Sequence, residues 1–217
     1  MVTDFSSTNS VVNEFVAELR DVDTQQDPLR FRFNLKRLGS VMAAEMSKSM
    51  AFTSAQVQTP LGSVTINRLA EQPVLATILR AGLPLHEGVA DVFDRAEQAF
   101  VSACRNYVDE AHSAFKIGID AVSAPPLDGK VLVVSDPMLA TGESLVQVLT
   151  ALFASHGTPT SVHVLVAIAS KQGIAHLQKH HPSAHLWVAA VDSELNDKGY
   201  IIPGLGDAGD LAFGTKK

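Results

Sequence analysis

VLVVSDPMLATGES, residues 131–144, is the stretch that decides the fold of this chain. An apolar strand is predicted to run into a turn rich in small and hydroxyl residues, and an amphipathic helix follows at once. Such a turn points several backbone N–H groups at one spot, beside the positive end of the helix dipole. Gly142 lets the backbone approach a ligand, while Thr141 and Ser144 add hydroxyl donors. Asp136 adds a carboxylate that can hold sugar hydroxyls or a metal. The stretch therefore predicts a pocket for a phosphate carried on a sugar.

The chain after Lys130 alternates regularly between strand-like and helix-like segments. The predicted strands are apolar on both faces, as buried parallel strands should be. The alternation predicts a parallel α/β sheet with right-handed crossovers. The expected elements are a strand at 131–135, a helix at 144–155, a strand at 162–169, a helix at 172–180 and a strand at 186–191.

Three predicted strands end in a polar residue: Arg80 after Ile78-Leu79, Asp136 after Ser135, and Asp192 after Val191. Ligands in open α/β sheets bind outside the carboxyl ends of the strands. We therefore expect three unlike loops to converge on one crevice.

The first half of the chain is expected to supply further helices and strands. Its apolar residues recur at helical spacing in two places, and a proline opens a third helix. The stretch 106–126 is the least regular and is compatible with a hairpin. The expected elements are helices at 11–19 and 28–49, a turn at 59–62, a strand at 74–78, a helix with Pro84 in its first turn, and a strand at 100–105.

Bulk properties narrow the class of protein. The 217 residues suit one domain, and 46% apolar with 18% charged residues is typical of a globular chain. A net charge of −6 argues against broad nucleic-acid binding. The longest apolar run, within 162–169, is too short to cross a bilayer, so no membrane partner is expected. A single cysteine, Cys104, and an N-terminus without a signal-peptide pattern lead us to expect a cytoplasmic protein.

Three segments resemble the uracil phosphoribosyltransferases, a family of type I phosphoribosyltransferases. They read ILRAGLP (78–84), DPMLATGES (136–144) and LNDKGYIIPGLGDAGDLAFGT (195–215). Weaker similarity runs through 19–24, 59–61 and 181–182, so the resemblance covers nearly the whole chain from about residue 19. The C-terminal segment is the most specific part, because it separates this family from other type I members.

The resemblance implies an α/β fold, a parallel-sheet type I phosphoribosyltransferase core with a small hood and a β-arm. Residues 1–217 would form a single domain whose hood combines the N-terminal helices with the C-terminal segment. The implied reaction joins uracil to 5-phospho-α-D-ribose 1-diphosphate (PRPP) and gives UMP and diphosphate, a step of pyrimidine salvage. The resemblance also implies Mg²⁺ as cofactor and a homodimer or larger homo-oligomer.

The resemblance implies that PRPP binds at two loops and two arginines. Arg80 and Arg105 would hold the diphosphate, because the planar guanidinium group grips phosphate oxygens. Glu143 stands where the family usually has glycine, and in a first helical turn it can point to solvent and still favour the dipole. The implied 5′-phosphate loop consists of Asp136, Pro137, Met138, Leu139, Ala140, Thr141, Gly142, Glu143 and Ser144.

The C-terminal segment is implied to bind uracil and to assist catalysis. A pyrimidine edge offers two carbonyl acceptors with an N–H donor between them, which backbone groups can read. The implied uracil contacts are main-chain groups of Ile201, Gly206 and Ala208, with Asp207 among them. Asp207 would also face the PRPP diphosphate, directly or through Mg²⁺, as the one protein ligand of the metal. Asp207 and Arg80 are therefore the predicted catalytic residues.

Two other functions stay open from the sequence. One is the same transfer to a different base, against which the segment GYIIPGLGDAGD argues. The other is a catalytically weakened sensor or regulator that binds a phosphoribosyl ligand on the same fold. Two residues depart from the usual sequence of the family, as they would in such a weakened protein. They are Glu143, and Leu211 where a basic residue is common.

Overall fold

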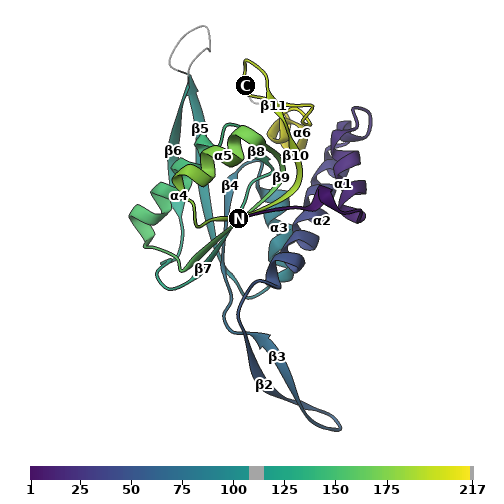
Figure 1. Ribbon diagram of the computed structural model, residues 1–217, viewed down its shortest axis with the longest axis vertical. Helices are drawn as coiled ribbons and strands as arrows, with labels where there is room; N and C mark the ends of the chain where they lie inside the picture. Colours follow the sequence, from purple (N-terminus) through teal and green to yellow (C-terminus); the bar gives the residue numbers. More distant parts are fainter. Residues whose placement is uncertain (108–114, 216–217) are drawn as a thin grey trace.

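A mainly parallel sheet forms the centre of the computed structural model, which describes residues 1–107 and 115–215, the backbone alone for 104–107 and 115–117 (Figure 1). Within this sheet, all neighbouring strands run parallel except β5 and β6, which confirms the predicted parallel α/β sheet. The spatial order is β1 (Val2–Asp4), β10 (His185–Asp192), β9 (Ser161–Ser170), β7 (Val131–Ser135), β4 (Val74–Leu79), β5 (Glu97–Tyr107) and β6 (Phe115–Ser123), with β8 (Met138–Leu139) beside β9.

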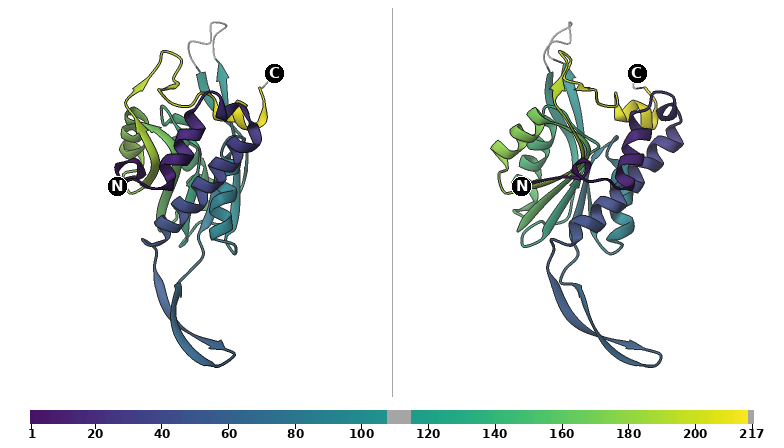
Figure 2. Two further views of the ribbon diagram at one scale, coloured as in Figure 1. Left: turned by 90° about the vertical axis from the view of Figure 1, so that its right-hand side faces the viewer. Right: turned by 45° about the vertical axis from the view of Figure 1, so that its right-hand side comes forward.

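Helices cover both faces of this sheet, which is why its central strands are apolar throughout. Successive residues of β7 face opposite sides: Val133 packs with the three N-terminal helices, and Val134 packs with the two later ones. Figure 2 shows the two layers from the side. The first layer holds α1 (Val11–Arg20), α2 (Pro28–Ser47) and α3 (Leu83–Val92), and the second holds α4 (Glu143–His156) and α5 (Lys171–His180).

The predicted helices and central strands are confirmed, with ends that differ by at most three residues. Helix α2 begins where predicted because Asp27 caps it, accepting hydrogen bonds from the N–H groups of Leu29 and Arg30, and Pro28 occupies its first turn. The predicted hairpin at 106–126 is confirmed as far as β6 pairs antiparallel with β5. Its tip lies outside the described residues.

A two-stranded arm projects from the body below α2 and β4 (Figures 1 and 2). It consists of β2 (Phe52–Thr59) and β3 (Gly62–Leu69), joined by the predicted turn at 59–62. The arm agrees with the β-arm that the family resemblance implied. No helix among the described residues is both long enough and apolar enough to cross a membrane.

A histidine cluster lies where β9 and β10 run side by side. The indole N–H of Trp187 donates to Nδ1 of His163 over 3.1 Å, and the His163 and His185 rings are 5.9 Å apart. Burial, and to a smaller extent the neighbouring His185, lowers the pKa of His163 from 6.5 to about 4. His163 is therefore neutral in the folded protein at neutral pH.

This lowered pKa should make the protein lose stability in mild acid. Between pH 6.5 and about 4 the unfolded chain binds a proton at His163 that the folded protein does not, so the free energy of unfolding falls as pH falls. We expect a loss on the order of 2 kcal/mol. Urea unfolding of His163→Asn, which keeps an acceptor for Trp187, should depend less on pH over this window.

The control is His180→Asn, at an exposed position of α5. It should unfold with the pH dependence of the unmodified protein. If the free energy of unfolding changed equally with pH in the unmodified protein and in His163→Asn, the role given to His163 would be contradicted.

Candidate functional site

A pocket of about 480 Å³ opens at the carboxyl ends of β4 and β7. This volume lies within the range of small-molecule sites, and the position is the one expected for ligands of parallel sheets. Segments that are far apart in the sequence contribute to it. Its lining consists of Ile78, Ala81, Ala103, Asp136, Met138, Leu139, Ala140, Thr141, Gly142, Ser144, Leu145, 199–201 and 206–210.

The 138–144 loop forms one wall, and its shape follows from glycine. Gly142 has a φ of +83° and caps α4, so the amino end of a 14-residue helix begins at the pocket. A Cβ at Gly142 would lie 2.9 Å from the carbonyl oxygen of Gly173, at the start of α5. The hydroxyl of Ser170 donates to the carbonyl of Ala140 from the same side. Contacts from Ser170 and Gly173 therefore hold the loop on the side away from the pocket. On the other side, the loop presents the positive end of the helix dipole to the pocket.

Two residues of the predicted phosphate loop do not line the pocket. Glu143 is the first residue of α4 and is exposed, as the sequence indicated for a carboxylate beside a phosphate. Pro137 is buried behind the loop, where its carbonyl accepts from the N–H of Ile168 over 3.0 Å. The roles of both residues in binding PRPP stay predictions.

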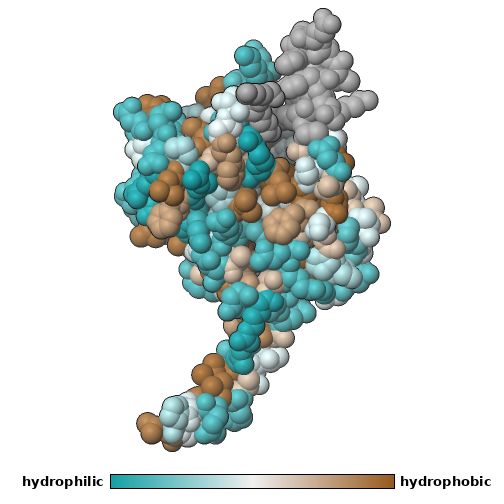
Figure 3. Space-filling view, turned by 180° about the vertical axis from the view of Figure 1, so that it is seen from behind, coloured by the Kyte–Doolittle hydropathy of each residue, from teal (hydrophilic) through white to brown (hydrophobic). Residues whose placement is uncertain are grey.

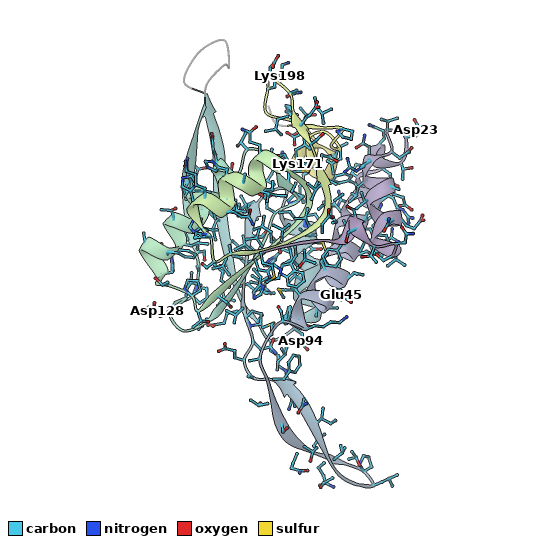
Figure 4. The ribbon with its side chains drawn as sticks, in the orientation of Figure 1. Asp23, Glu45, Asp94, Asp128, Lys171 and Lys198 are labelled. Atoms are coloured by element: carbon cyan, nitrogen blue, oxygen red, sulfur yellow. The ribbon has the colours of Figure 1, made fainter. Side chains whose placement is uncertain are left out.

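The C-terminal segment forms the opposite wall. It begins with a hairpin of β11 (Glu194–Leu195) and β12 (Ile201–Ile202) and ends in the short helix α6 (Ala208–Phe213). Figure 4 shows Lys198 at the outer end of the loop between β11 and β12. Oδ1 of Asp207 caps α6 by accepting from the N–H of Asp210 over 3.0 Å. The structure therefore brings the predicted uracil residues Ile201, Gly206, Asp207 and Ala208 to the pocket that the phosphate loop lines.

Of the two predicted diphosphate arginines, only Arg80 has a described side chain. It lies beside the pocket, where Nη2 is 3.6 Å from Oδ1 of Asp210 and donates to the carbonyl of Gly214 over 3.3 Å. Its buried Nε has no hydrogen-bond partner among the residues that the structure describes. Arg105 lies on β5 opposite Ile117, and its side chain is outside the described residues.

Three carboxylates line the pocket: Asp136, Asp207 and Asp210. Within the described ranges, no three side chains of His, Cys, Asp or Glu are grouped so as to hold a metal ion. Mg²⁺ usually binds through one or two carboxylates together with substrate phosphates, so the carboxylates present fit a metal that arrives with a diphosphate. Asp210, Gly199 and Tyr200 line the pocket although the sequence did not single them out. Only their position inside the segment 195–215, which resembles the family, could have indicated them from the sequence.

The expected convergence of three loops is confirmed, because residues that follow β4, β7 and β10 all line this one pocket, but Asp192 itself does not line it. Asp192 ends β10 as predicted, but only 8% of its side chain is exposed, and both carboxylate oxygens bind Arg20 behind the C-terminal segment. The loop that follows β10 therefore reaches the pocket, while Asp192 at the end of that strand binds Arg20 outside the pocket lining.

Comparisons with known proteins show similarity over nearly the whole chain. The family model described as uracil phosphoribosyltransferase matches residues 6–215. A uracil phosphoribosyltransferase of Porphyromonas gingivalis is 45% identical over 216 residues, covering 99% of each chain. One of Methanothermobacter thermautotrophicus is 41% identical over 190 residues, 87% of this chain and 85% of that protein. The solved structure of the AQ2163 protein from Aquifex aeolicus superposes with a TM-score of 0.87 at 33% identity, covering 99% and 98% of the two chains.

Proposed function

Because the chain belongs to the uracil phosphoribosyltransferase family, we propose that its pocket joins uracil to PRPP and releases UMP and diphosphate. One observation carries the proposal: the 138–144 loop and the 201–208 segment, some sixty residues apart, line a single pocket. A phosphate-binding wall and a base-binding wall are what a nucleotide-forming site requires. The reaction returns a free base to the nucleotide pool.

The donor is proposed to bind through its 5′-phosphate at the 138–144 loop. Backbone N–H groups, the hydroxyls of Thr141 and Ser144 and the amino end of α4 all favour an anion there. The carboxylate of Asp136, at the end of the preceding strand, suits the ribose hydroxyls. Arg80 and Arg105 are proposed to hold the diphosphate, and Arg80 would exchange its contacts with Asp210 and Gly214 for phosphate oxygens.

Uracil is proposed to lie against the 201–208 segment, read by main-chain groups of Ile201, Gly206 and Ala208. In this proposal the whole chain is one domain, whose hood consists of α1, α2 and the C-terminal segment. Figures 1 and 2 show these elements side by side, and Arg32 of α2 donates to the carbonyl of Ala212 in α6 over 2.6 Å. This contact supports a hood built from both ends of the chain.

Chemistry in this site is proposed to depend mostly on orientation and on stabilising the leaving group. N1 of uracil attacks C1 of the ribose while the bond from C1 to the diphosphate oxygen breaks. Asp207 would face the diphosphate and hold Mg²⁺ beside it, and it is the candidate acceptor for the N1 proton of uracil. When bound, Mg²⁺ would supply positive charge that neutralises the leaving diphosphate.

The test is incubation of the purified protein with uracil, PRPP and Mg²⁺, followed by chromatography for UMP. We expect UMP to form with uracil, and a panel of other free bases to give little product. A different preferred base would support the same transfer with another specificity. Binding of PRPP without any nucleotide product would support the sensor or regulator instead.

We also propose that the protein is a homo-oligomer assembled in part through its arm. One face of the arm carries Ala55 and Val57 opposite Ile66 and Val64, and Leu61 at its turn is 99% exposed. Figure 3 shows the hydrophobic residues at the end of the arm. A two-stranded hairpin is marginally stable alone in water, so a second copy that covers its apolar face would stabilise it.

The proposal predicts that Val64→Lys with Ile66→Lys lowers the mass measured by sedimentation at micromolar concentrations. Ser54→Lys with Asn67→Lys, on the polar face of the same strands, is the control and should leave the assembly intact. A monomeric unmodified protein at these concentrations would contradict the proposal. Because the lone cysteine fits a reducing compartment, we propose the cytoplasm as its location, which cell fractionation tests.

A further inference from the structure

An ion pair lies behind the 201–208 segment, outside the pocket. Arg20 ends α1 and Asp192 ends β10, 172 residues later in the chain. The guanidinium group of Arg20 donates to both carboxylate oxygens of Asp192, with both distances 2.8 Å. The exposed fractions are 23% for the Arg20 side chain and 8% for Asp192. A bidentate pair that is largely withdrawn from water has one well-defined geometry.

The same two side chains hold both polar backbone groups of one residue, Gly204. Nη1 of Arg20 donates to the carbonyl oxygen of Gly204 over 2.9 Å. Oδ2 of Asp192 accepts from the N–H of Gly204, also over 2.9 Å. Gly204 is buried and has a φ of +57°, and a Cβ there would collide with the carbonyl of Ile201. The ion pair therefore holds this tight turn through both the N–H and the carbonyl group of Gly204.

The neighbouring residue is held in a similar way. With its side-chain amide oriented to satisfy its hydrogen bonds, Gln25 donates to the carbonyl of Leu205 over 2.8 Å and to that of Leu19 over 3.2 Å. The end of α1 and the turn after it thus contact two successive carbonyl groups of the C-terminal segment. No such contact reaches the 138–144 loop among the described residues, where α5 and β9 provide the support.

We propose that the Arg20–Asp192 pair is a clamp that positions the base-reading backbone and thereby sets the affinity for uracil. The inference rests on the proposed function of the 201–208 segment. Gly204 lies between Ile201 and Gly206, two of the residues proposed to contact the base. A base recognised through main-chain groups has no flexible side chain to compensate when that backbone moves. Neither Arg20 nor Asp192 lines the pocket, so both are positioning residues.

Removing the clamp should weaken uracil binding selectively. For Arg20→Gln we expect the KM for uracil to rise at least tenfold, while the KM for PRPP stays within twofold. Asp192→Asn should act in the same direction, because its amide N–H₂ cannot accept the second bond from Arg20. Arg20→Lys keeps the charge but lacks the two-pronged geometry, and it should recover part of the affinity.

The matched control is Arg30→Gln. Arg30 forms a bidentate pair with Glu18 between α1 and α2, both distances being 2.6 Å, and among the described residues it makes no hydrogen bond to the C-terminal segment. This variant loses an ion pair of similar geometry nearby, so both KM values should stay unchanged. Arg30→Gln acting like Arg20→Gln would show that general loosening of α1 is the cause.

A second measurement needs no activity. In the substrate-free protein, hydrogen exchange at the amide of Gly204 should be at least tenfold faster in Arg20→Gln, or in Arg20→Lys if the former does not fold. Exchange in α4 should be unchanged. Unchanged exchange at Gly204, equal shifts in both KM values, or faster exchange throughout would overturn the clamp. Lack of UMP formation by the unmodified protein would refute the proposed function, while the exchange experiment would still test the clamp.

Discussion

Asp207→Asn is expected to lower the rate of UMP formation by about a hundred- to a thousandfold while leaving the fold intact. Asp207 lines the pocket within the segment that we propose binds the base. Asparagine keeps the oxygen that accepts from the N–H of Asp210 and is an equally good helix cap, so α6 should persist. The substitution removes the negative charge, and with it the proposed metal contact and the candidate proton acceptor.

The comparison for this variant is Asp27→Asn. Asp27 caps α2 through the same kind of hydrogen bond, outside the pocket lining, so this substitution should change neither turnover nor the unfolding temperature. Steady-state UMP formation and thermal unfolding should be measured on both variants. Together they distinguish the effect of losing the carboxylate charge from the effect of changing the helix cap. Turnover of Asp207→Asn close to that of the unmodified protein would remove Asp207 from the mechanism.

Gly142→Ala should have the second-largest effect, about a hundredfold on kcat/KM for PRPP, or about 2.7 kcal/mol. Gly142 needs a left-handed backbone, which costs an alanine about 1–2 kcal/mol. The added Cβ would also press on the carbonyl of Gly173, 2.9 Å away, and on His176. The added methyl group should therefore displace the 138–144 loop that we propose binds the phosphate. The KM for uracil should change little.

Gly129→Ala provides the control for backbone strain. Gly129 has a similar φ of +76°, but a Cβ there meets no atom within 4 Å, and the residue does not line the pocket. It should cost some stability without changing the kinetics. If both alanine variants lost stability equally and kept full activity toward PRPP, the loop would not be the phosphate site.

Local pattern was sufficient for the elements that bury one or two continuous apolar faces. Helix α2 was predictable because Phe31, Leu35, Leu38, Met42 and Met46 recur at helical spacing, and all five are buried. The strands around 131–135 and 162–169 were predictable because both of their faces meet helices. The 138–144 loop was also predictable, because the strand, the glycine and the helix that form it are adjacent in sequence.

Short elements and long-range pairs were not predictable in this way. Strand β1 and helix α6 have three and six residues, too few to show a period. The first strand of the arm does show a local signal, because Ala55 and Val57 alternate with polar residues. The loop after Asp192 reaches the pocket as expected, but the partner of Asp192, Arg20, lies 172 positions away in the sequence, and no local pattern indicates that pair.

The most direct measurement is a crystal structure of the protein soaked with UMP. We expect the phosphate at the backbone amides of 139–144, the uracil ring against Ile201, Gly206 and Ala208, and the ribose between them near Asp136. Nucleotide density elsewhere on the molecule, or a base turned away from the 201–208 segment with the phosphate outside the loop, would contradict the account.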